Sequence, residues 1–259
     1  MHSKDSFYIL IFIYLFCFAG CKNYRDYLTK ARYYTNTKQF DNAIAEYDKV
    51  IKLKPCLDTA YYERAEATIK GSFYIKDGIV IYGAAQQSLK DYDKAILLNP
   101  NYLDAFEGRA FAKLQVEDMD GAYADYSRAI QLSSENFYNY YHRGDLELQK
   151  KNYTSALKDF DKAILLDSLF PNSYLFPRDQ LFIVRAITKY ELDMVSEAME
   201  DFTEAYKRDT NHDDYSSIII WMGYCKFKLN DTLGGCALWE ELYLQGDTDA
   251  QVLMKKYCN

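Results

Sequence analysis

Six copies of one nine-residue pattern recur along this chain of 259 residues. They are AIAEYDKVI from Ala43, SLKDYDKAI from Ser88, AYADYSRAI from Ala122, ALKDFDKAI from Ala156, AMEDFTEAY from Ala198 and GCALWEELY from Gly235. Their first residues lie 45, 34, 34, 42 and 37 positions apart. Such a period is typical of stacked repeat proteins, in which each repeat buries its apolar face against its neighbours. We therefore expect the chain to act through an extended surface rather than a catalytic pocket.

The spacing of apolar residues within the repeats predicts helices. Segments such as Asp41–Lys54 and Ser155–Leu166 carry apolar side chains at i, i+3, i+4 and i+7. Only four prolines and eleven glycines are present, which disfavours disorder and an all-β fold. We therefore expect an all-α fold.

The first residues of the chain have the features of a targeting segment. Phe7 to Ala19 is an unbroken apolar run of 13 residues, whereas a helix that spans a bilayer needs roughly 20. The run therefore fits the apolar region of a signal peptide over residues 1–20. An ordinary secretory signal and a short membrane anchor are the alternatives.

The tetrad Phe18-Ala19-Gly20-Cys21 resembles the bacterial lipobox, although Phe18 stands where an aliphatic residue is more usual. The resemblance implies cleavage before Cys21 and lipidation of its thiol. Lys22 follows, not the aspartate that retains some lipoproteins in the inner membrane. We therefore expect a lipid-anchored protein of the bacterial envelope, with the outer membrane as first choice.

Composition and motifs argue against several other functions. With a net charge of −7 and a pI near 5.1, the chain lacks the excess of basic residues that is typical of a nucleic-acid binder. Four cysteines follow Cys21 without a Cys-x-x-Cys pair, and His142 and His212 are the only histidines in that part of the chain, which disfavours a zinc site. No Gly-rich phosphate loop or nucleophile elbow is present, so we expect no cofactor and no catalytic residue.

Read in register, the repeats resemble the tetratricopeptide repeat, whose 34-residue units pair a helix A with a helix B. That family has small residues at unit positions 8 and 20 and a large one at position 24, which here are Ala31, Ala43 and Tyr47 in the first unit. The resemblance implies a right-handed α-solenoid of about six antiparallel helix pairs over residues 21–246. Its units lie near residues 24–57, 58–102, 103–136, 137–170, 179–212 and 216–246, and residues 247–259 form a capping helix.

Positions 7 and 23 of these units vary together. A basic residue at 7 accompanies an acidic residue at 23 in five units, starting with Lys30 and Glu46, while the sixth has Met222 and Leu238. This co-variation predicts structural ion pairs between helices A and B, not a catalytic site. The arginine and aspartate pairs are Arg64 and Asp91, Arg109 and Asp125, Arg143 and Asp159, and Arg185 and Asp201.

Two insertions interrupt the period. Residues 68–83 predict either lengthened helices, which we favour, or a β-hairpin that turns at Lys76-Asp77-Gly78. The second insertion, Pro171–Arg178, predicts a loop. Either could add a binding lobe, and tolerated loop growth is the simpler interpretation.

In the tetratricopeptide family, ligands lie along a concave groove built from helix A positions 2, 5, 9 and 12. The residues at these positions would form a groove that changes from mixed charge to aromatic along the chain. The alternative is that these side chains pack against one another or against the C-terminal helix and bind no ligand. The set of lysines and asparagines that binds C-terminal carboxylates in chaperone-binding members is absent. The candidate groove residues are Tyr62, Glu66, Glu107, Phe111, Tyr141, Asp145, Ile183, Ile187, Tyr190, Ile220, Tyr224 and Phe227.

The cysteines near the C-terminus are candidates for a disulfide. Cys236 and Cys258 could join the capping helix to the last helix B, with Cys225 as the competing partner and free buried thiols as the alternative.

The sequence thus predicts a non-catalytic scaffold that binds a peptide or protein at the bacterial envelope. A structural subunit of a permanent envelope complex, for secretion, motility or outer-membrane assembly, is the alternative. A hydrolase that acts through scattered carboxylates is a remote third possibility.

Overall fold

The computed structural model describes residues 24–75, 82–169, 178–209 and 214–258, which form thirteen α-helices and no strand. The signal segment with Cys21, most of the Pro171–Arg178 insertion and His212 lie outside these ranges. The helices are α2 (Tyr24–Asn36), α3 (Phe40–Leu53), α4 (Asp58–Ile75), α5 (Tyr82–Leu98), α6 (Leu103–Gln115), α7 (Met119–Leu132), α8 (Phe137–Gln149), α9 (Tyr153–Leu169), α10 (Arg178–Glu191), α11 (Val195–Arg208), α12 (Tyr215–Lys228), α13 (Thr232–Leu244) and α14 (Thr248–Tyr257).

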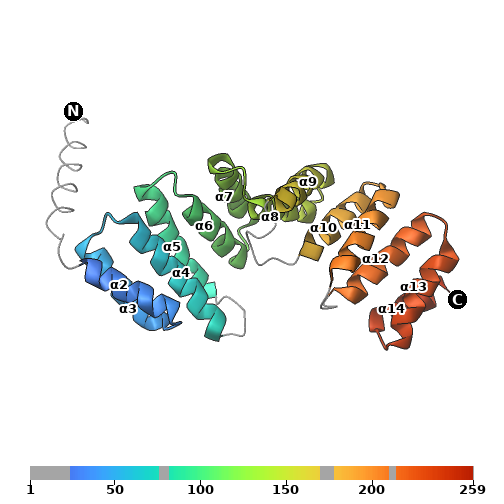
Figure 1. The fold of residues 1–259 in the computed structure, drawn as a ribbon, viewed down its shortest axis with the longest axis horizontal. Coiled ribbons are helices and arrows are strands. Elements are labelled where there is room, and N and C mark those ends of the chain that lie inside the picture. The colour runs from blue at the N-terminus through green and yellow to red at the C-terminus, as the bar shows by residue number, and fades with distance from the viewer. Residues whose placement is uncertain (1–23, 76–81, 170–177, 210–213, 259) are drawn as a thin grey trace. The chain divides into compact units, whose positions relative to one another are not determined.

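The helices pack as consecutive pairs, and the chain divides into two compact bodies (Figure 1). The N-terminal body ends at Ser134 and holds the pairs α2–α3, α4–α5 and α6–α7. The C-terminal body starts at Glu135 and holds α8–α9, α10–α11 and α12–α13, with α14 packed on α13. The all-α fold of paired helices that the repeats predict is confirmed.

Small residues and one aromatic ring form the core of each pair. In the first pair, Ala31 and Ala43 are fully buried, and the ring of Tyr47 fills the space beside them. Gly144 takes the place of Ala31 in α8 because a Cβ atom there would lie 2.9 Å from Cε1 of Phe160. The aromatic residue at this place is buried in every pair: Tyr47, Tyr92, Tyr126, Phe160, Phe202 and Trp239.

The turns between paired helices share a strained backbone position. One non-glycine residue in each of five turns has a φ of 60–62°, in the left-handed region that costs an L-residue about 1–2 kcal/mol. The residues are Lys38, Glu117, Lys151, Asp193 and Asn230.

The described part of the first insertion is helical. Helix α4 has 18 residues and α5 has 17, whereas α2, α6 and α8 each have 13. The lengthened helices that we favoured are therefore present up to Ile75 and from Tyr82 onward. The proposed hairpin turn at Lys76-Asp77-Gly78 lies outside the described residues.

Candidate interaction surface

The arginine and aspartate residues that vary together form bidentate ion pairs within their helix pairs. Nε and Nη2 of each arginine donate to the two carboxylate oxygens over 2.6–2.8 Å. The aspartate side chains are only 5–10% exposed. The structure thus brings together Arg64 and Asp91, Arg109 and Asp125, Arg143 and Asp159, and Arg185 and Asp201.

Three of these arginines also connect neighbouring repeats. Nη1 of Arg64 donates to Asp48 over 2.5 Å, although Asp48 belongs to the helix B of the preceding repeat. Nη1 of Arg109 and of Arg185 make the corresponding bonds to Asp93 and Asp161 over 2.7 and 2.9 Å. The planar guanidinium group can serve two carboxylates at once, which a lysine ammonium on a flexible stem does less well. These charges therefore stabilise the stack.

The first and last repeats differ from the middle ones. The predicted pair of Lys30 with Glu46 is wrong, because Glu46 accepts a 2.6 Å bond from Lys49 one turn further along its own helix. In the last repeat, Met222 and Leu238 pack against the same buried cluster, in place of an ion pair.

A pocket of about 260 Å³ opens between α2 and α4 in the N-terminal body. Two predicted groove residues, Tyr62 and Glu66, lie in its wall. The full lining is Arg32, Thr35, Asn36, Tyr47, Tyr62, Glu63, Glu66 and Lys70.

The charged groups of this pocket pair across and along its wall. Nε and Nη2 of Arg32 donate to the carboxylate of Glu63, with a shortest distance of 2.6 Å. Glu66 accepts a 2.7 Å bond from the Tyr92 hydroxyl and lies 3.0 Å from Nζ of Lys70. The glutamate side chains are 21% and 24% exposed, whereas both cationic side chains are 53% exposed.

Two tyrosine rings, Tyr47 and Tyr62, line the pocket, and further carboxylates act on Tyr62. Burial raises the pKa of Tyr62 well above its usual value, and the negative charges of Glu66, Asp104 and Glu107 raise that pKa further. The predicted groove residue Phe111 packs beside Tyr62 against the core of this body. Negative charges of α4 and α6 thus act on the Tyr62 side of the pocket.

The predicted groove of the C-terminal body is largely occupied by its own side chains. Ile183 is only 5% exposed and belongs to the core, with Ile187 and Tyr190 packed against it. Ile220 packs in the cluster that leads to the capping helix. The prediction that Ile183 lines an open groove is therefore wrong, because its side chain points into the helix stack.

Trp221 is a half-buried aromatic residue that lies outside the predicted groove positions. Its ring lies 5.4 Å from Tyr190 and 5.7 Å from Tyr224, centre to centre, and stacks on Phe202 at 6.1 Å. It is at position 6 of its repeat, beside the expected position 5. A tryptophan next to an expected groove position and three residues before Tyr224 was the available signal.

Helix α8 buries a histidine among aromatic rings. The His142 ring lies 4.1 Å from Tyr138 and 5.0 Å from Tyr141, centre to centre. Burial lowers the pKa of His142 to about 4. Burial also raises the pKa of Asp145, the predicted groove residue one turn later, although its bond from Gln149 partly opposes this.

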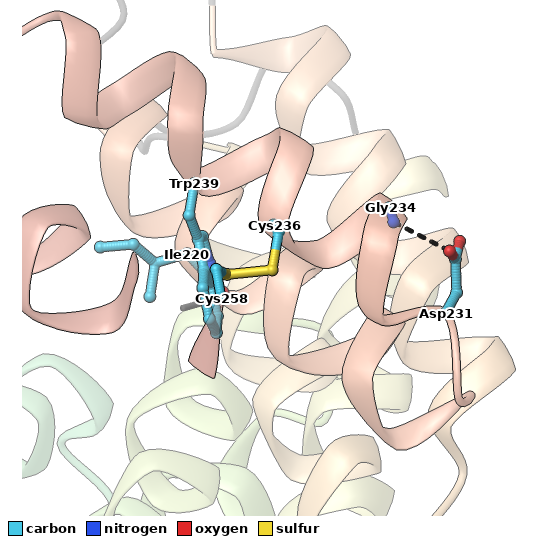
Figure 2. The surroundings of a disulfide bond; sticks show 6 residues. All are labelled: Ile220, Asp231, Gly234, Cys236, Trp239 and Cys258. Atoms are coloured by element: carbon cyan, nitrogen blue, oxygen red, sulfur yellow. Dashed lines mark hydrogen bonds between the residues drawn. A yellow bond between two sulfur atoms is a disulfide. The ribbon is translucent and has the colours of Figure 1, made fainter. Parts of the chain in front are cut away.

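A disulfide joins Cys236 of α13 to Cys258 at the end of α14 (Figure 2). Cys225 is buried and free. Trp239 lies beside the disulfide, and its indole nitrogen donates to the carbonyl of Ile220 over 3.1 Å. On α14, Tyr257 lies 5.5 Å from the ring of Phe227 and 6.5 Å from that of Tyr224. The capping helix thus covers two predicted groove residues.

The described residues contain no cluster of three or more His, Cys, Asp or Glu side chains that could hold a metal ion. None of the helices that the structure describes is both long and apolar enough to cross a membrane.

Comparison with known proteins agrees with this geometry. A family model described as the tetratricopeptide repeat matches residues 27–55 and 138–168. The fold is that of tetratricopeptide repeat proteins. Among curated proteins, none matches this chain.

Three solved structures of similar fold illustrate the likeness. YrrB, described as a TPR protein with an unusual peptide-binding site, is 16% identical with a TM-score of 0.65 over 81% of this chain and 97% of its own. MamA from Desulfovibrio magneticus RS-1 is 14% identical, with a TM-score of 0.61 over 75% and 99%. The Cut9–Hcn1 hetero-tetramer of APC/C is 15% identical, with a TM-score of 0.60 over 90% and 42%. At these identities the likeness concerns the fold.

Proposed function

We propose that this chain is a non-catalytic scaffold that binds a peptide or protein segment, and that a lipid on Cys21 anchors it to the bacterial envelope. The observation that carries the binding proposal is the pocket between α2 and α4. It lies on helix A faces, where the resemblance to the tetratricopeptide family implies a ligand groove. The likeness to YrrB, whose description names a peptide-binding site, supports the same role.

The arrangement of charges favours binding over catalysis. The repeated aspartates are consumed in bidentate ion pairs, so they are poor general acids or bases. The carboxylates of the pocket are likewise held by Arg32, Tyr92 and Lys70. A pocket of this size suits one or two side chains of a peptide.

Site-specific photocrosslinking in intact cells tests the binding role. A photoreactive phenylalanine analogue would replace Thr35 in the pocket wall or, as the matched control, Glu200 on the exposed face of α11. We expect one discrete crosslinked product from position 35 and none from position 200. Equal products from both positions, or none from either, would contradict a binding surface in the pocket.

Lipid anchoring is tested separately through Cys21→Ser. We expect this variant to lose incorporation of labelled fatty acid and to leave the membrane fraction. Retention of both properties would show that an ordinary secretory signal or another anchor applies.

Exposed apolar side chains at the C-terminal end support the second candidate, a subunit of a permanent complex. Leu233 and Leu244 of α13 are 86% and 77% exposed, and Val252 of α14 is 64% exposed. Apolar contacts are more common in permanent interfaces than in transient ones. Purification without crosslinking would separate the two candidates, because a permanent complex survives dilution at constant stoichiometry whereas a transient one dissociates.

A further inference from the structure

We propose that the pocket between α2 and α4 receives a lysine or arginine side chain of the bound peptide, with Glu66 as its acceptor and Lys70 as an exchangeable counterion. This inference rests on the proposed binding function and names the chemical class of its ligand.

The first argument concerns which charges of the pocket are fixed. Glu66 is only 24% exposed and is held by the hydroxyl of Tyr92, a residue at the core of its helix pair. Glu63 is similarly enclosed and is held by a bidentate bond from Arg32. Both acceptors are therefore positioned before any ligand arrives, which lowers the entropic cost of binding.

The second argument concerns how easily Lys70 leaves. Lys70 and Glu66 lie four residues apart on one helix, and the lysine side chain is 53% exposed. Pairs of this kind on the surface of a helix contribute little to stability. A ligand cation can therefore replace the ammonium of Lys70 at Glu66 while the bond from Tyr92 stays intact.

The third argument concerns the sign of the surrounding field. The pocket lining holds two carboxylates, Glu63 and Glu66, and two cations, Arg32 and Lys70, and the negative charge of Asp104 also acts on its Tyr62 wall. The surplus is negative, and it lies over the apolar ring of Tyr62. Such a site suits the methylene stem of a lysine or arginine below its charged end. An acidic side chain would meet repulsion.

Selection from a library of random dodecapeptides against the full chain tests this inference. We expect enriched peptides to share a lysine or arginine that cannot be replaced by norleucine. Their affinity should fall at least tenfold in Glu66→Gln, whose amide oxygen still accepts the Tyr92 bond and so preserves the fold. Glu200→Gln removes the same charge from an exposed site on α11 and should leave the affinity unchanged.

A second variant should change the peptide affinity in the opposite direction. Lys70→Gln removes the competing cation, so affinity for the same peptides should rise about threefold. A merely structural role of this residue would lower the affinity or leave it unchanged.

The possible failures are distinguishable. If no peptide is enriched, the proposed function is overturned, and this inference falls with it. If enriched peptides are acidic, lack a shared basic residue, or bind Glu66→Gln as tightly as the wild type, only the present inference is overturned.

Discussion

At the residue scale, single side chains depart from their usual behaviour where the helix stack imposes it. The turns between paired helices force a positive φ onto residues that carry a Cβ atom, Lys151 among them. The packing of α8 keeps His142 among aromatic rings and lowers its pKa. Each departure has a free-energy cost that a substitution can expose.

Replacing Lys151 by glycine should stabilise the protein. Glycine adopts φ near 61° without the steric cost of a Cβ atom, and its greater freedom in the unfolded chain offsets part of the gain. We expect the free energy of unfolding in urea to rise by about 0.5–1 kcal/mol. Lys150→Gly, one residue earlier in the αR region, is the control and should not stabilise.

Acid should destabilise the protein through His142. The pKa of this group is lowered to about 4 in the folded state against about 6.5 unfolded, so the unfolded chain binds the extra proton between these values. Stability from this group is therefore present above pH 6.5 and is lost as the pH falls toward 4, by roughly 3 kcal/mol in all. The loss should be smaller in His142→Phe, measured by urea unfolding from pH 7 to 4.5.

The same comparison separates His142 from Asp145. The raised pKa of the Asp145 carboxyl acts with the opposite sign, because the folded state then binds the proton more readily as the pH falls. This contribution is common to the wild type and His142→Phe. Equal pH dependence in the two proteins would show that His142 is not the group responsible.

At the scale of paired helices, two kinds of contact join helix A to helix B in five of the six described pairs. Four pairs use an arginine and an aspartate, and the last uses Met222 and Leu238. The chain itself therefore shows that an apolar pair can replace the ionic one. The capping helix α14 adds a third kind of contact, the disulfide from Cys258.

Breaking one ion pair should cost more than replacing it. Arg143→Met alone leaves the mostly buried Asp159 carboxylate without its bidentate partner and should lower the free energy of unfolding by about 3 kcal/mol. Adding Asp159→Leu, which copies Met222 and Leu238, should recover at least 1 kcal/mol of that loss. A double-mutant cycle measured by urea unfolding checks this, and strictly additive losses would contradict a coupled pair.

Removing the disulfide should loosen the capping helix. Cys236 and Cys258 are separated by 22 residues, and a loop of that length corresponds to about 3 kcal/mol of stabilisation. We expect Cys236→Ser/Cys258→Ser to be less stable than the wild type by about this amount in urea unfolding under non-reducing conditions. Equal stability of the two proteins would contradict a stabilising role for this bond.

At the scale of the whole molecule, much of the fold could be predicted because the repeats act as an internal alignment. Three features could be read from this alignment: the period, the small and aromatic core positions, and the co-variation of arginine with aspartate. Each follows from contacts that form within one repeat. The predicted pairing of Lys30 with Glu46 failed because Lys49, on the same helix as Glu46, bonds this carboxylate instead. Aligning the repeats by position does not reveal such nearby cations.

The candidate surface was less predictable. Tyr62 and Glu66 do line a pocket, but Ile183 is buried, and Tyr224 and Phe227 are covered by Tyr257. Trp221 packs against Tyr190 and Tyr224, two predicted groove residues, without being at an expected position itself. Equivalent positions in different repeats meet different neighbours, so equivalence in sequence does not imply equal exposure.

The sequence alone determined the helix pairs and the ion pairs of the middle repeats, because residues within about one repeat of each other satisfy them. Only the tertiary structure decided which surface stays open, because exposure depends on how neighbouring repeats and the capping helix pack. The pocket beside Glu66 exists for that reason: the spacing of α2 and α4 leaves room between two rows of side chains, and no single repeat encodes that room.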